Sequence, residues 1–215
     1  MALYQGIVQL LFLQYWHVVI GGAIPLNLAG QICTKITDCK SDNSLIRHQI
    51  QKQLLLLNSS AGTLYDTYVH CQGFHPNLNI VCNKSYGDFP KYNLSKASEE
   101  EKLVEMFKIF TYMTAALGNI TTQQKQLNPK QHHLLKNLTR TLSSINAIIS
   151  NLSCVLCKKY HVTDVNVYYG KYPSSNPFEQ KQMGCQVLRI YKHFISEAAD
   201  SFAPSFGEWM DTMGH

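Results

Sequence analysis

The chain has 215 residues, of which 45% are hydrophobic and only 15% are charged. This composition allows a large buried core and is not that of a disordered chain. The formal net charge of +5 is modest, and no run of Lys and Arg is interleaved with aromatic residues, so a nucleic-acid partner is not expected. This small excess of positive charge favours, at most, weak attraction to acidic glycans or receptor surfaces.

The N-terminal segment has the order of a secretory signal peptide. An uncharged apolar stretch over residues 7–20 leads into the small residues Gly21, Gly22 and Ala23. We therefore expect residues 1–23 to be cleaved and the mature chain to be secreted and extracellular. The alternative is a membrane anchor, but the stretch is shorter than the roughly 20 apolar residues of a spanning helix, so no membrane insertion is expected.

Glycosylation motifs and cysteines support secretion. Five N-x-S/T motifs are expected to carry glycans: Asn58, Asn83, Asn93, Asn119 and Asn137. A sixth, at Asn151, is left out because a glycan there would crowd Cys154. Seven cysteines follow the expected cleavage point, so in an oxidising compartment six would pair and one would remain.

Four apolar stripes at helical spacing predict four helices. The first stripe is Ile46, Ile50, Leu54, Leu57, Leu64 and Tyr68. The second is Leu103, Met106, Phe110, Met113 and Leu117. The third is Leu135, Leu138, Leu142, Ile145, Ile149, Leu152 and Leu156. The fourth is Val187, Tyr191, Phe194, Ala198 and Phe202.

Local signals mark where these helices begin and end. Ser98 with Glu101 predicts a capping box at the start of the second helix, and Gly118–Asn119 predicts its end. Asn128–Pro129 and Asn176–Pro177 predict the starts of the third and fourth helices, because Asn caps free amides and Pro suits the first helical position. No segment alternates with a period of two, although residues 164–169 could form a short extended piece.

The connections predict the topology. Long segments join the first helix to the second and the third to the fourth, and each can run the length of the bundle to join parallel neighbours. The connection between the second and third helices is short and suits antiparallel neighbours. We predict an all-α, up-up-down-down four-helix bundle with two long crossovers over residues 24–203, followed by a tail, 204–215, with no assigned function.

The C-x-x-C motif of Cys154 and Cys157 closes the third helix, and its two side chains point to one side. Zinc would need two further ligands, of which His161 supplies at most one. A redox pair usually opens a helix, where the dipole lowers the thiol pKa. We therefore favour structural disulfides, and expect no metal or cofactor.

The predicted topology places the segment before the first helix beside the end of the third. Two disulfides, Cys33–Cys157 and Cys39–Cys154, would tie that segment down. A third, between Cys82 in the first crossover and Cys185 in the fourth helix, would pin the crossover to the bundle. Cys71 would be left unpaired.

Four segments together resemble a known family: "QIQKQLLLLNSSAGTLY", "LVEMFKIFTYMTAALGNIT", "CVLCKKYHVTDVNVYYG" and "FEQKQMGC". Residues 33–203 are similar to the leukemia inhibitory factor and oncostatin M family of long-chain helical cytokines. Six of the seven cysteines match those of its leukemia inhibitory factor branch, whose pairing is the one given above. Oncostatin M and ciliary neurotrophic factor share the fold without this set of six.

The resemblance implies a monomeric, secreted cytokine. It would join the leukemia inhibitory factor receptor to the family's shared signal-transducing glycoprotein receptor chain and start JAK–STAT signalling. The alternative is an oncostatin M-like or other related cytokine that uses a different receptor pair. An enzyme is not expected, because the histidines are scattered and no phosphate loop, HExxH or GxSxG motif occurs.

The resemblance also implies two receptor-binding sets. Phe178 and Lys181, one turn apart at the start of the fourth helix, would contact the specific receptor, although Phe178 could simply pack under the crossover. Exposed positions on the first and third helices would meet the shared receptor chain: Gln49, Lys52, Leu56, Ser143, Ser144, Ala147 and Ser150. The alternative for the second set is a merely solvated face.

Overall fold

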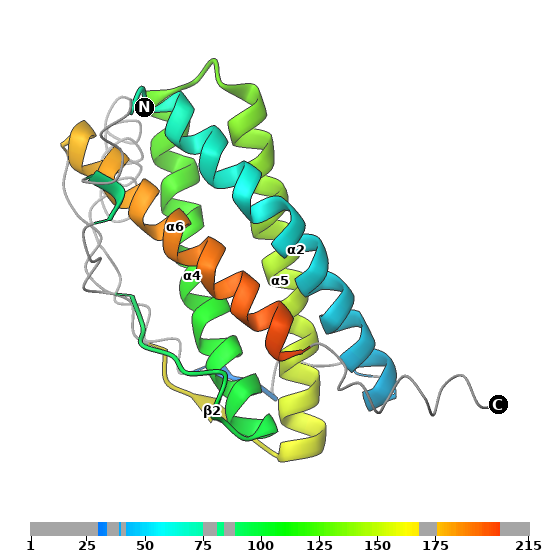
Figure 1. Cartoon of the computed structure of the whole chain (residues 1–215). Coiled ribbons are helices and arrows are strands. Elements are labelled where there is room, and N and C mark those ends of the chain that lie inside the picture. Colours follow the sequence, from blue (N-terminus) through cyan, green and yellow to red (C-terminus); the bar gives the residue numbers. More distant parts are fainter. Residues whose placement is uncertain are drawn as a thin grey trace, which may run out of the picture.

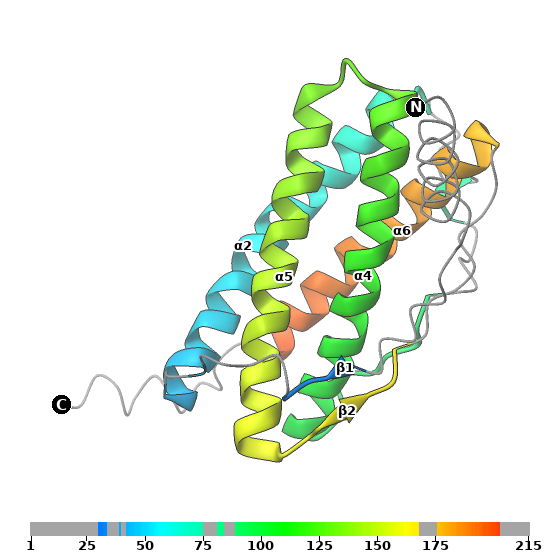
Figure 2. The same ribbon diagram turned by 180° about the vertical axis from the view of Figure 1, so that it is seen from behind.

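The computed structural model describes residues 30–33, 39, 42–74, 81–83, 89–167 and 176–202. The expected signal peptide and the C-terminal tail lie outside these residues. The described residues form four long helices: α2 (Asn43–Cys71), α4 (Glu99–Leu127), α5 (His132–Tyr160) and α6 (Pro177–Ser201). Two short strands, β1 (Gly30–Gln31) and β2 (Asp164–Val165), pair antiparallel beside the bundle (Figure 2).

The helices form the predicted up-up-down-down bundle (Figure 1). α5 and α6 each pack against both α2 and α4. The starts of α2 and α4 meet through Arg47 and Glu99, and their ends meet through Gln72 and Gln124, so these two helices run parallel. They face each other diagonally across the core, and the prediction that the crossovers join neighbouring helices was wrong. The antiparallel helices between them separate the parallel pair.

The predicted stripes of α2, α4 and α6 form the core, apart from half-buried Phe202 at the end of the last one. The α5 stripe is only partly correct. Its centre, Leu138, Ile145 and Leu152, is fully buried, but Leu142 and Ile149 are half-buried, and the buried face also includes Leu134, Thr141 and Ile148. The buried residues Leu134, Leu138, Thr141, Ile145, Ile148, Leu152 and Val155 keep a spacing of four and three along the whole helix. The centre of the buried face therefore lies one position before the predicted stripe at every second residue, and Leu135, Leu142 and Ile149 lie at its border.

Two predicted boundaries were wrong. α4 does not end at Gly118–Asn119 but continues to Leu127, because Ile120 and Gln124 beyond the glycine are fully buried. Asn128 is the C-cap of α4, where its N–H donates to the Gln124 carbonyl over 2.8 Å. α5 consequently begins only at His132, and the connection is shorter than predicted.

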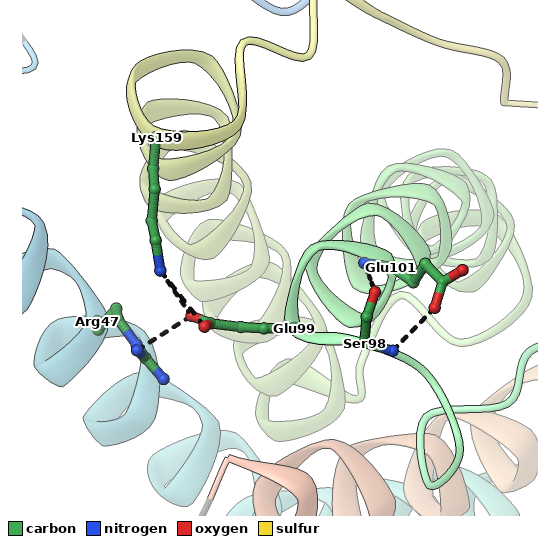
Figure 3. Close-up of polar contacts among 5 residues, drawn as sticks. All are labelled: Arg47, Ser98, Glu99, Glu101 and Lys159. Carbon is green, nitrogen blue, oxygen red and sulfur yellow. Dashed lines mark hydrogen bonds and ion pairs between the residues drawn. The ribbon is translucent and has the colours of Figure 1, made fainter.

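Two other predicted helix starts are present. The Glu101 N–H donates to Ser98 Oγ and the Ser98 N–H donates to the Glu101 carboxylate, which completes a capping box (Figure 3). Asn176 Oδ1 accepts from the Phe178 N–H over 2.9 Å, with Pro177 as the first residue of α6. Both arrangements satisfy backbone donors that a helix start leaves unpaired.

Three disulfides join the pairs expected from the sequence: Cys33–Cys157, Cys39–Cys154 and Cys82–Cys185. The first two fix the chain before α2 to the last turns of α5, where the Ile32 N–H also donates to the Thr163 carbonyl. Of the possible extended piece 164–169, Asp164 and Val165 form β2, residues 166 and 167 are irregular, and residues 168 and 169 lie outside the described chain.

Candidate receptor-binding surfaces

Phe178 lies in the first turn of α6 with its side chain 54% exposed. One edge contact holds it: its ring meets that of Phe74, which follows the end of α2, at 6.4 Å between centroids and nearly perpendicular. Phe178 thus packs against the start of the crossover and also presents about half of its surface to solvent. An aromatic group held in this way loses little conformational entropy on binding a partner.

Lys181 follows one helical turn later and shares the face of Phe178. Its side chain is half-buried, and its backbone carbonyl accepts a hydrogen bond from the Tyr68 hydroxyl over 3.2 Å. A cation therefore lies beside the exposed ring, on a helix start that is anchored to α2.

A buried amide cluster lies beneath this pair, at the end of the bundle where α2 and α4 end. Gln124 Nε2 donates to the Tyr68 hydroxyl over 3.3 Å, and Gln72 Nε2 donates to Gln124 Oε1 over 2.8 Å. Asn128 Nδ2 donates to the same oxygen over 2.7 Å. Burial raises the pKa of Tyr68, which keeps the phenol neutral and able to donate to Lys181. Together with the Tyr68–Lys181 hydrogen bond, the cluster joins the ends of α2 and α4 to the start of α6 below Phe178.

The sequence prediction missed this cluster. Gln72 and Gln124 continue the helical spacing of their apolar stripes, four residues after Tyr68 and seven after Leu117. A polar residue at a core position of a stripe is the signal that could have revealed it, because buried polar side chains need hydrogen-bond partners.

The expected contacts for the shared receptor chain come together on one face. Gln49, Lys52 and Leu56 are exposed along α2. On the neighbouring α5, Ser144 is half-buried and three positions are exposed: Ser143, Ala147 and Ser150. Asn151 Nδ2 donates to Gln53 Oε1 over 3.0 Å and joins the two helices within this face. We call these seven residues the α2–α5 surface.

Leu45 belongs beside this surface and was missed. It is 59% exposed, close to the 61% of Leu56, and it precedes Gln49, Lys52 and Leu56 at spacings of four, three and four. That spacing places all four side chains on one side of α2. Two exposed leucines on one helix face are the kind of apolar contact that a partner surface covers.

The expected glycan acceptors occupy different settings. Asn83 and Asn93 are exposed in the first crossover, whereas Asn58, Asn119 and Asn137 are half-buried in helices. Asn151, left out of the expected set, uses its amide in the bond to Gln53.

An ion-pair centre holds the opposite end of the bundle (Figure 3). Glu99, in the first turn of α4, contacts Arg47 Nη1 of α2 at 3.0 Å and Lys159 Nζ of α5 at 3.3 Å. Partial burial would raise the pKa of Glu99, but the Arg47 charge and the hydrogen bond from Lys159 outweigh it and lower the pKa. The carboxylate is therefore charged at neutral pH and links three helices.

Glu99→Gln should destabilise the protein by roughly 0.5 kcal/mol at pH 7, because exposed ion pairs contribute little. A lowered carboxyl pKa adds stability above the ordinary pKa of the group, and this stability is lost as the pH falls through the folded-state value. The difference from wild type should vanish at about pH 2, where both side chains are neutral. Urea unfolding at both pH values measures the difference in unfolding free energy between the variant and wild type. An equal difference at both pH values would show that the charge of Glu99 is not responsible.

Among the described residues, no group of three or more His, Cys, Asp or Glu side chains that could hold a metal ion occurs. In the same part of the chain, no helix is long and apolar enough to cross a membrane.

Cys71, which is not in a disulfide, is half-buried at the end of α2, and burial raises the pKa of its thiol.

Comparison with known families agrees with the four-helix bundle. A family model described as the LIF / OSM family matches residues 45–202. This match begins two residues into α2 and extends past the end of α6, so it includes all four helices and both crossovers. The chain belongs to the LIF / OSM family of cytokines.

Proposed function

We propose that the protein is a secreted cytokine of the leukemia inhibitory factor type that brings two receptor chains together. Residues 1–23 would be its signal peptide and residues 24–203 its mature bundle. Phe178 and Lys181 would bind the leukemia inhibitory factor receptor. The α2–α5 surface would bind the shared signal-transducing glycoprotein receptor chain, so that the cytoplasmic kinases meet and JAK–STAT signalling begins.

The observation that carries the proposal is the exposed aromatic side chain at the start of α6. Phe178 is the only aromatic residue among the exposed large hydrophobic side chains of the described chain, and a capped helix start and an edge contact hold it. Binding energy at protein interfaces is concentrated in few residues, with large side chains and cations prominent among them. A held phenylalanine next to Lys181 fits that description.

The position of the two surfaces supports a ligand that engages two receptors at once. Phe178 lies where α2 ends and α6 begins, whereas Gln49 and Lys52 lie in the first half of α2 and Ser150 lies in the second half of α5. No residue belongs to both surfaces. One small, disulfide-bonded bundle can therefore offer them at the same time, without competition between the receptors for one site.

The test is the binding of the secreted, glycosylated protein to the two purified receptor ectodomains, separately and together. We expect one molecule of each receptor to join one cytokine in a ternary complex, measured by light scattering after size-exclusion chromatography. Failure to form this complex would refute the proposed receptor pair. Complex formation with another receptor pair of the family would instead indicate an oncostatin M-like cytokine.

A further inference from the structure

The first half of α5 carries positive charge that the receptor proposal does not use. From residue 106 to residue 163 the sequence has no Asp or Glu. Lys130 precedes α5 in the turn that stands at one end of the bundle (Figure 1), and Lys136 and Arg140 follow on the helix. All three side chains are exposed, and none of them forms an ion pair with a described residue.

A shallow hollow lies on this part of the surface. Its lining combines two cations, three hydroxyl groups and one leucine: Leu135, Lys136, Thr139, Arg140, Ser143 and Ser144. The last two also belong to the α2–α5 surface, which the hollow adjoins. Lys136 and Arg140 are one helical turn apart, about 6 Å along the axis, and share a face. No carboxylate lines the hollow, so its electrostatics favour an anion.

The start of α5 adds a second, independent feature. Its N-cap, Gln131, makes no side-chain capping bond, and its first turn contains no acidic residue. Most helix starts carry a capping side chain or an acidic residue, because the first amides and the helix dipole favour negative charge. Here Lys130 and two histidines, His132 and His133, occupy that position instead. An external anion would supply the negative charge that the sequence leaves out.

We infer that this surface, formed by Lys130, Lys136, Arg140 and the start of α5, binds a sulfated glycosaminoglycan. Sulfate groups present several charged oxygen acceptors, and Arg and Lys bind such oxygens through charge-assisted hydrogen bonds. From His132 to Arg140 the helix rises about 12 Å, so the surface suits an extended polyanion better than a single small ion. For a secreted protein, such polysaccharides are the polyanions of the surrounding matrix.

An anionic membrane is the competing partner. Peripheral membrane binding combines basic residues with apolar side chains that enter the lipid. The exposed large hydrophobic residues of the described chain are Leu45, Leu55, Leu56 and Phe178. They lie on α2 and α6, and none lies on α5. The surface therefore has the charge that lipid binding needs without the apolar anchors.

The test compares two double variants that remove the same charge. Lys136→Ala with Arg140→Ala removes the centre of the hollow. Lys96→Ala with Lys158→Ala removes two exposed lysines at the opposite end of the bundle, near the start of α4 and the end of α5. Binding to immobilised heparin and to heparan sulfate oligosaccharides is measured over a range of NaCl concentrations. A parallel set in an Asn137→Gln background removes any glycan beside the hollow.

We expect the hollow variant to weaken heparin binding by at least about tenfold and to lower the slope of log K against log[NaCl] by about two, one for each lost contact. The control variant should change affinity less than about twofold, with the same thermal stability. Equal losses in both variants would overturn the inference, because net charge alone would explain them. Tighter binding to phosphatidylserine vesicles than to heparin would overturn it in favour of a lipid surface. Neither outcome bears on the receptor pair.

Discussion

Phe178→Ala combined with Lys181→Ala is expected to weaken binding to the leukemia inhibitory factor receptor by at least about 100-fold while the bundle stays folded. Truncating an anchor residue at an interface typically costs 2 kcal/mol or more, which corresponds to about 30-fold for Phe178→Ala alone. Removing the neighbouring cation as well should bring the total to at least about 100-fold. The measurement is surface plasmon resonance against the purified receptor ectodomain.

The fold should tolerate this change because both side chains lie at the edge of the core. Phe178 is 54% exposed and its ring contacts that of Phe74; an aromatic pair of this kind contributes about 0.5–1.5 kcal/mol. The hydrogen bond from Tyr68 reaches the backbone carbonyl of Lys181, which the substitution to Ala retains. Circular dichroism and the urea midpoint should therefore remain close to those of wild type.

Lys192→Ala supplies the matched control. Lys192 is an exposed lysine of the same helix, three turns further on, and its removal changes the net charge by the same amount as Lys181→Ala. Binding to the shared receptor chain is the second control, because the α2–α5 surface contains neither Phe178 nor Lys181. Unchanged affinity of the double variant for the specific receptor would refute the assignment. Loss of binding to both receptors would indicate a folding defect.

Much of the fold follows from local sequence signals. Ser98 with Glu101 and Asn176 with Pro177 fix two helix starts through hydrogen bonds within a single turn, and such short-range patterns can be read without knowing the tertiary structure. The apolar stripes of α2, α4 and α6 gave the core for the same reason. The cysteine pairs followed from the family resemblance and from the predicted topology, which places the segments that contain them at the same ends.

The errors arose where tertiary contacts override local preference. Gly118 resembles a helix stop, but Ile120 and Gln124 after it are buried, and their burial outweighs the roughly 1 kcal/mol cost of glycine in a helix. Asn128 resembles an N-cap, but it caps the end of α4 and bonds to Gln124 instead. Whether a polar residue between two helices caps the first or the second depends on hydrogen-bond partners that are distant in sequence.

The candidate surfaces could be predicted only in part for a related reason. The apolar stripes locate the exposed faces of α2 and α5, but the Gln53–Asn151 bond that joins them links residues 98 positions apart. The charge of the α5 hollow was visible as a long stretch without Asp or Glu, whereas its shape was not. Charge patterns can be read from a sequence, but the curvature of a surface depends on the packing of side chains.

Gly184→Ala is expected to destabilise the protein by roughly 2–6 kcal/mol, the sum of an overpacked core and a buried hydrogen-bond network that loses partners. A Cβ at Gly184 would overlap the hydroxyl and ring of Tyr68, which is fully buried on α2. The missing side chain is what allows the Tyr68 hydroxyl to reach the Lys181 carbonyl. Alanine would force either a new tyrosine rotamer, with loss of the bonds to Lys181 and Gln124, or a wider separation of α2 and α6.

The expected loss of stability in Gly184→Ala is opposite in sign to the effect that helix propensity alone predicts. Helix propensity alone predicts that Ala in place of Gly stabilises a helix by up to about 1 kcal/mol. Gly118→Ala in α4 is the matched control, because a Cβ there would meet nothing within 4 Å, and it should show that gain. Urea unfolding with the disulfides intact measures both variants. Tyr68→Phe should recover part of the loss in Gly184→Ala, since it removes the oxygen that the new methyl group meets. If Gly184→Ala proved as stable as Gly118→Ala, this would contradict the close contact between α2 and α6. It would also contradict the anchoring of the α6 start, which carries Phe178, to α2.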